Sequence, residues 1–206
     1  MLTEEIKNKI KILFSEKKYE EVIETSERFS SPEDRPAGLI NIIGISYFLK
    51  ENRNENDIKT ALTFFELTYL KDKNTIHGLN GLKNLILMGI KASIEFKNLS
   101  NFLINAKNHF IDAEKYFDKN EEFLNAGLVL SLHLLDINLQ KKITQKILDS
   151  NNKSKSLRGL SLFMKNYFFD SSQEDYFNYA KNNSRNYFKL KVKNLNEIEY
   201  KVNDKI

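Results

Sequence analysis

Three histidines are the residues in this sequence best suited to bind a metal ion or to move a proton. His77, His109 and His133 lie in different segments, and none has a second ligand beside it at a spacing typical of a metal site. Gly78 and Gly81, in the stretch HGLNG, do not follow a strand and so do not suggest a phosphate-binding loop. The sequence therefore predicts no catalytic residue, no metal ligand and no cofactor, and this chain is not expected to be an enzyme by itself.

A different kind of chemistry is open to three asparagines, Asn41, Asn80 and Asn84. An amide side chain offers two donors and one acceptor, so a row of amides can hydrogen-bond the backbone of an extended peptide. The chain is rich in asparagine throughout, and the alternative is that these three fall on one surface by chance. The peptide-binding hypothesis requires elements that place all three on one face.

Composition limits what those elements can be. The chain has 206 residues and no cysteine, so it is long enough for a sizeable core and has neither disulfides nor thiolate metal sites. No apolar run approaches the ~20 residues of a membrane helix. The start, MLTEEIKNKIKILF, carries acids where a signal peptide is basic. We therefore expect a cytoplasmic protein without a membrane segment.

Apolar residues at spacings of three and four predict an all-α fold over most of the chain. Short connections favour antiparallel helix pairs. About ten helices are expected, near residues 2–16, 19–29, 36–50, 57–71, 75–96, the segment after FKNLS, 121–135, 139–149, 156–169 and 173–187. Residues 1–187 are predicted to form one helical-repeat domain, and residues 188–206 a short extended basic tail.

Small and large residues recur at set positions within these pairs. In LINIIGISYF, Ile40 precedes the pair Ile43–Gly44 by three positions, and Tyr47 follows the glycine by three. Small residues let two helices approach, so Gly44 is expected to be a contact glycine. This pattern resembles the tetratricopeptide repeat. The positions that carry the resemblance are Tyr19, Val22, Ile40, Ile43, Gly44, Tyr47, Ala61, Phe65, Ala106, Phe110 and Ala113.

The resemblance implies an α-solenoid whose first helices line a concave face that binds a protein or peptide segment. Asn41, Asn80 and Asn84 all fall on first helices of their pairs. The stretch from Gly44 to Ala61 is longer than the family's spacing, and the polar run ENRNEND is interpreted as an insertion between the two helices.

The end of the chain carries a second resemblance. The segment YFNYAKNNSRNYFKLKVKNLNEIEYKVNDKI is similar to the linker that follows the helical repeats in bacterial proteins of the O-GlcNAc transferase (SPINDLY-like) family. The resemblance implies that a strand of a glycosyltransferase domain would begin near 204–206, and that the family's catalytic residues would lie beyond this sequence. None of those residues can be carried over to this chain.

Three functions are therefore left open. The first is a protein-binding module that forms the N-terminal substrate-recognition part of an O-GlcNAc transferase-like enzyme. The second is a freestanding adaptor or scaffold without catalysis. The third is nucleic-acid binding through the basic end, because residues 151–206 contain eleven Lys or Arg against six Asp or Glu. Only five of all basic residues are Arg, which disfavours base readout.

Overall fold

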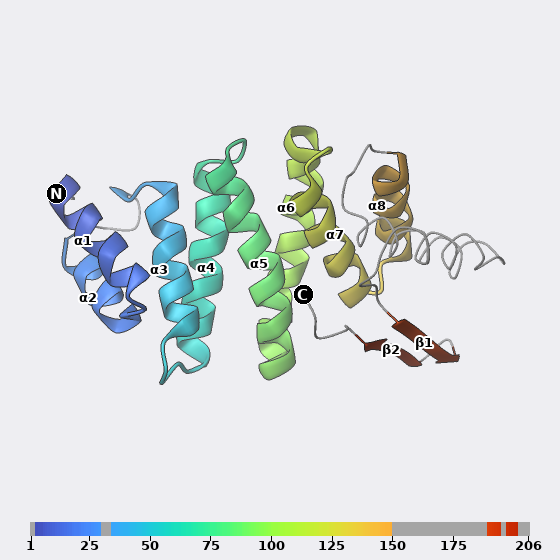
Figure 1. Cartoon of the computed structure of the whole chain (residues 1–206), viewed down its shortest axis with the longest axis horizontal. Coiled ribbons are helices and arrows are strands. Elements are labelled where there is room, and N and C mark those ends of the chain that lie inside the picture. The colour runs from blue at the N-terminus through green and yellow to red at the C-terminus, as the bar shows by residue number, and fades with distance from the viewer. Residues whose placement is uncertain (1–2, 30–33, 150–188, 195–196, 202–206) are drawn as a thin grey trace. The chain divides into compact units, whose positions relative to one another are not determined.

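A computed structural model describes residues 3–29, 34–149, 189–194 and 197–201 (Figure 1). The described residues contain eight α-helices and the short 3-10 helix η2 (Lys97–Ser100). The helices are α1 (Glu4–Ser15), α2 (Tyr19–Phe29), α3 (Ala37–Leu49), α4 (Glu55–Lys71), α5 (Ile76–Glu95), α6 (Asn101–Phe117), α7 (Glu121–His133) and α8 (Ile137–Asp149). The two helices expected near 156–169 and 173–187 lie outside the described residues.

The chain divides into two compact units, Met1–Asp118 and Lys119–Ile206. The boundary falls between α6 and α7, inside the stretch that the sequence suggests as one helical domain. The first unit holds α1 to α6, and the second holds α7, α8 and a hairpin of two strands. No helix in the described part of the chain combines the length and the apolar character needed to cross a bilayer.

Side-chain caps set several helix starts. The Asn54 side chain accepts from the Asp57 backbone N–H at 3.1 Å, and the Asp57 carboxylate accepts from the Asn54 N–H at 2.9 Å. This reciprocal cap starts α4 two residues before the predicted Asp57. Thr75 caps α5 by accepting from the His77 backbone N–H at 3.2 Å. The helix bounds therefore follow local chemistry that is visible in the sequence.

Two of the helix connections turn sharply through a residue other than glycine. Lys17 (φ 60°) links α1 to α2, and Leu135 (φ 53°) links α7 to α8. Both turns close the same way: the Lys18 N–H donates to the Leu13 carbonyl, and the Asp136 N–H donates to the Ser131 carbonyl. These bonds satisfy carbonyls left open at a helix end and fold each pair into a tight hairpin.

In the first unit each helix packs on the next, and α3 also contacts both α1 and α5. The predicted packing positions lie at these contacts: all are buried except Tyr19 and Tyr47, which are half-buried. Gly44 sits against α4, and a Cβ built there would lie 2.8 Å from Phe65 Cε1. Gly81 approaches the backbone of α4 itself, since a Cβ built there would lie 2.8 Å from the Phe65 carbonyl oxygen. Glycines thus let α4 approach the helices on both sides.

The buried pattern of α3 and α4 recurs in α5 and α6 with a shift of 45 positions. The segment ENRNEND therefore belongs to the repeating unit, because the distance along the chain from Gly44 to Ala61 equals that from Gly89 to Ala106. A connection longer than the tetratricopeptide spacing is thus present in both pairs, and its interpretation as an insertion relative to that repeat stays a prediction. The matching buried positions are Ile40 and Leu85, Gly44 and Gly89, Ile58 and Leu103, Ala61 and Ala106, Phe65 and Phe110, and Thr68 and Ala113.

The second unit ends in two strands within the predicted tail. Strands β1 (Lys189–Asn194) and β2 (Glu197–Lys201) pair antiparallel, with Leu190 opposite Tyr200 and Val192 opposite Ile198. The register shifts between Val192 and Asn194. The alternation of apolar and polar residues in this tail predicts an extended or partly strand-like segment, and the two strands lie within it.

Candidate functional site

The structure brings two of the three predicted asparagines into contact. Asn41 lies on α3 and Asn84 on α5, and Asn84 Nδ2 donates to Asn41 Oδ1 at 2.9 Å. Both side chains are half-buried. Asn80 lies one turn before Asn84 on α5 and is also half-buried. The bond leaves the Asn41 nitrogen and the Asn84 oxygen for other partners.

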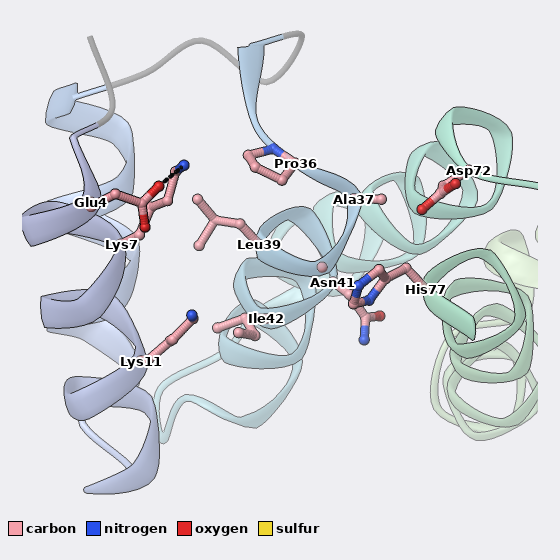
Figure 2. A pocket seen from close by; sticks show the side chains of 11 residues that line it. Glu4, Lys7, Lys11, Pro36, Ala37, Leu39, Asn41, Ile42, Asp72 and His77 are labelled. Carbon is pink, nitrogen blue, oxygen red and sulfur yellow. Dashed lines mark hydrogen bonds and ion pairs between the residues drawn. The ribbon is translucent and has the colours of Figure 1, made fainter. Parts of the chain in front are cut away.

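A cavity of about 580 Å³ opens beside Asn41 (Figure 2). Its walls come from α1, from the first two turns of α3, and from the loop and first turn that lead into α5. We call the side of the first unit formed by α1, α3 and α5 the first-helix face, since these are the first helices of their pairs. The cavity is lined by Glu4, Lys7, Lys11, Pro36, Ala37, Gly38, Leu39, Asn41, Ile42, Asp72 and His77. Neither Asn80 nor Asn84 lines it.

The charged groups of the cavity sit mainly on α1. Lys7 Nζ lies 2.5 Å from Glu4 Oε1, and the bond from Lys7 is the largest cause that lowers the pKa of Glu4. Lys11 extends from the next turn toward Ile42 (Figure 2). Since Glu4 is already paired with Lys7, Lys11 gives this wall of the cavity its positive character.

On the opposite side, His77 approaches the start of α3. A Cβ built at Gly38 would lie 3.1 Å from both His77 Cε1 and His77 Nδ1. A glycine at this position lets the imidazole ring rest against the first turn of α3. His77 is thus an exposed ring at the cavity rim.

His77 and His109 do not come together in the first unit, and His133 belongs to the second unit. His77 lies at the cavity rim, His109 is paired with Glu66, and His133 is exposed at the end of α7. Among the described residues no group of three or more His, Cys, Asp or Glu side chains could hold a metal ion. The cavity combines one amide, several charged side chains and an apolar wall, which is chemistry for binding.

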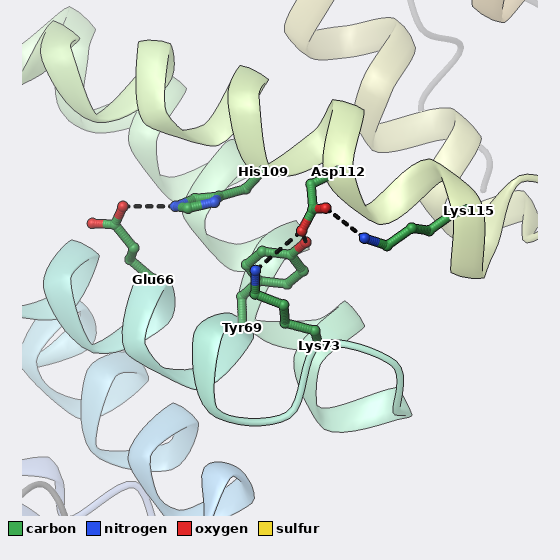
Figure 3. A network of polar contacts seen from close by, with 6 residues as sticks. All are labelled: Glu66, Tyr69, Lys73, His109, Asp112 and Lys115. Atoms are coloured by element: carbon green, nitrogen blue, oxygen red, sulfur yellow. Dashed lines mark hydrogen bonds and ion pairs between the residues drawn. The ribbon is translucent and has the colours of Figure 1, made fainter.

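A second polar cluster, which the sequence analysis missed, joins α4 to α6 (Figure 3). His109 Nε2 lies 2.8 Å from Glu66 Oε1, and the His109 and Tyr69 rings lie 5.1 Å apart. Asp112 accepts from the Tyr69 hydroxyl at 3.0 Å, from Lys73 Nζ at 3.1 Å and from Lys115 Nζ at 2.7 Å. We call these six residues the α4–α6 seam. The side chains of the seam form hydrogen bonds and ion pairs with one another, and these contacts stabilise the packing of α4 against α6.

Electrostatics in the seam favour the charged carboxylate and the neutral phenol. Hydrogen bonds from Lys115, Lys73 and Tyr69 hold the pKa of Asp112 well below its usual value of 3.8. Burial, followed by the bond to Asp112, raises the pKa of the Tyr69 hydroxyl above its usual value of 10.0. Both shifts stabilise the arrangement near neutral pH.

The contacts between successive pairs share a sequence separation that could have revealed them. Asn41 with Asn84, Glu66 with His109, and Tyr69 with Asp112 are each 43 residues apart. Glu55 and Asn98 form a further hydrogen bond at the same separation. This spacing is close to the shift of the buried pattern, so equivalent helices of consecutive pairs lie side by side.

Comparisons with protein-family models, curated proteins and solved structures give no match. The function is therefore inferred from the residues of this chain.

Proposed function

We propose that the first unit is a helical-repeat module of the α-solenoid type, which binds a segment of another protein on its first-helix face. The cavity of about 580 Å³ beside Asn41 carries this proposal, because its walls come from three successive first helices. Stacked helix pairs use the surface along one set of helices in this way, since each pair adds one wall to a continuous groove.

The repeating unit supports a solenoid and refines the resemblance to the tetratricopeptide repeat. Contacts of α3 with both α1 and α5 are those of stacked pairs. The small and aromatic packing positions are those of the tetratricopeptide pattern. The shift from Gly44 to Gly89 exceeds the roughly 34 residues of that repeat and fits the range of about 40–47 residues of other helix-pair repeats. The longer connection before α4, closed by Asn54 and Arg53, accounts for much of the difference.

A library of random displayed peptides tests the proposal. The wild-type chain is expected to enrich peptides whose binding is lost when Ile42, at the cavity wall, is changed to Arg. A matched change, Ile104→Arg on the exposed surface of α6, should leave binding intact. The proposal fails if no peptide is enriched, or if Ile104→Arg weakens binding as much as Ile42→Arg does.

The wider proposal is that this module presents a protein substrate to a glycosyltransferase-like domain, and only the resemblance of the last residues supports it. The adaptor without catalysis is its competitor. Reading the gene in frame past the codon of Ile206 separates them: a sugar-nucleotide-binding domain there would favour the first, and a stop codon the second.

A further inference from the structure

The first-helix face repeats apolar residues that the fold buries only in part, and Ile42 also packs against the hydrophobic core. On α3, Ile42 and Ile45 are half-buried and Leu49 is 40% exposed. The positions 45 residues later, on α5, are Leu87, Ile90 and Ile94, and all three are also apolar. We call these six residues the apolar stripes. Leu87 is 41% and Ile94 74% exposed, so the second stripe is open to solvent.

Recurrence distinguishes the stripes from a stray exposed side chain. Single exposed apolar residues are common on protein surfaces, whereas contiguous ones point to a contact. Each stripe has spacings of three and four, which keep its members on one side of a helix. The Asn41–Asn84 hydrogen bond joins α3 and α5, so the two stripes belong to neighbouring helices.

The geometry of the stripes suits a helical ligand. Positions seven residues apart on a helix span roughly 10 Å, or two turns. Two such rows on equivalent helices make parallel ridges, and a third helix can place residues i, i+3, i+4 and i+7 between them. An extended peptide would bind chiefly through polar side chains, whereas the residues that recur on this face are apolar.

Two lysines lie beside the stripes, together with two acids: Asp72 at the cavity, and Glu95, which is paired with Arg53 at 3.0 Å. Lys91 lies between Leu87 and Ile94 on α5, and its Nζ is 5.7 Å from the centre of the Phe48 ring of α3. Lys11 extends toward Ile42 at the other end of the face (Figure 2). Glu4, an acid of α1 that also lines the cavity, is paired with Lys7.

We propose that the segment bound on the first-helix face is an amphipathic helix with an apolar side and acidic edges, contributed by a partner protein. This inference rests on the proposed function and names the class of partner. The apolar side of the ligand packs between the stripes, and its carboxylates meet Lys11 and Lys91.

The test is a selection on the full-length chain, with a displayed library of random peptides of about four helical turns. Enriched peptides should carry apolar residues at i, i+3 or i+4, and i+7, together with a net negative charge. Ile94→Asp should weaken their binding at least about 10-fold, because it places a carboxylate in the groove. Lys91→Glu should weaken it and make it less sensitive to salt. Ile104→Asp, an exposed isoleucine of α6 at 57%, is the matched control and should change binding less than about twofold.

Other outcomes would overturn the inference. The inference is wrong if the enriched peptides are basic or lack the apolar spacing. It is also wrong if Ile94→Asp and Ile104→Asp bind the peptides equally well, because the stripes would then not bind such a helix. If Ile42→Arg still abolishes that binding, the proposed function survives and only the class of ligand is wrong. If no peptide is enriched at all, both the proposed function and the inferred class of ligand are wrong. Binding to vesicles of phosphatidylserine that is lost in Ile94→Asp, without peptide enrichment, would assign the stripes to a lipid surface instead.

Discussion

At the scale of single residues, the two equivalent glycines of the repeat meet different neighbours. The Cβ of an alanine at Gly44 would lie 2.8 Å from Cε1 of Phe65, which is fully buried. At Gly89 the nearest atom is the Leu103 Cδ2 methyl at 3.0 Å, the end of a flexible side chain. Identical substitutions at equivalent positions should therefore have different effects.

We predict that Gly44→Ala lowers the free energy of unfolding by about 1 kcal/mol. Overpacking costs about 1–3 kcal/mol, which exceeds the ~1 kcal/mol that alanine adds in helix propensity. Gly89→Ala should be close to neutral, since the Leu103 side chain can shift and the propensity gain offsets the cost. Urea unfolding of both variants measures this. Equal losses in the two variants would contradict the assignment of Gly44 as the tighter contact.

At the scale of elements, the α4–α6 seam links stability to pH. Contacts hold the pKa of Asp112 below its usual 3.8 in the folded state, so the folded chain binds a proton there less readily than the unfolded chain does. Stability from this group is complete above the unfolded pKa and is lost as pH falls through it toward the folded pKa. The loss therefore occurs below about pH 4.

We predict that wild-type protein loses more stability between about pH 5 and about pH 2 than Asp112→Asn does, because the variant has no carboxylate to protonate there. Lys115→Gln removes one of the two ammonium partners and should give an intermediate slope. Chemical unfolding at a series of pH values supplies the curves. Parallel curves for wild type and Asp112→Asn would show that the seam contributes no pH dependence.

The same scale shows what the sequence can predict. The side chains of Thr3, Asn54, Thr75 and Asn120 each accept a hydrogen bond from a backbone N–H two or three residues later and so set a helix start. Such caps are local, and the eight described helices lie within about two residues of their predicted bounds. The pairing of Asn84 with Asn41 depends on how two helices 43 residues apart are stacked. Spacing within one helix carries no information on that stacking. Aligning the sequence with itself at a shift of 45 residues would have shown which helices are equivalent and therefore stacked side by side.

The candidate site was predicted in part. The first helices do carry Asn41, Asn80 and Asn84, but only Asn41 lines the cavity. Lys11 and His77 reach the cavity from helices on either side of α3, and their position depends on the tertiary packing of the first unit. No local pattern in the sequence places these two residues at a common cavity.

At the scale of the whole molecule, the division at Asp118 predicts how the chain unfolds. The first unit contains its own buried core and its own seam, so residues 1–118 should fold when expressed alone. We expect a cooperative thermal transition in this fragment, at a midpoint that matches one of the transitions of the full chain in calorimetry. A fragment without a cooperative transition would show that the second unit is needed for the fold of the first.

The shift of 45 residues between the two inner helix pairs also bears on how such a gene changes length. A recombination event between the codons of Gly44 and those of Gly89 would add or delete one whole pair, with the glycine contact and the Asn-capped connection kept in register. Each added pair would extend the apolar stripes by one more ridge, so the reach of the binding face and the size of the gene would grow together.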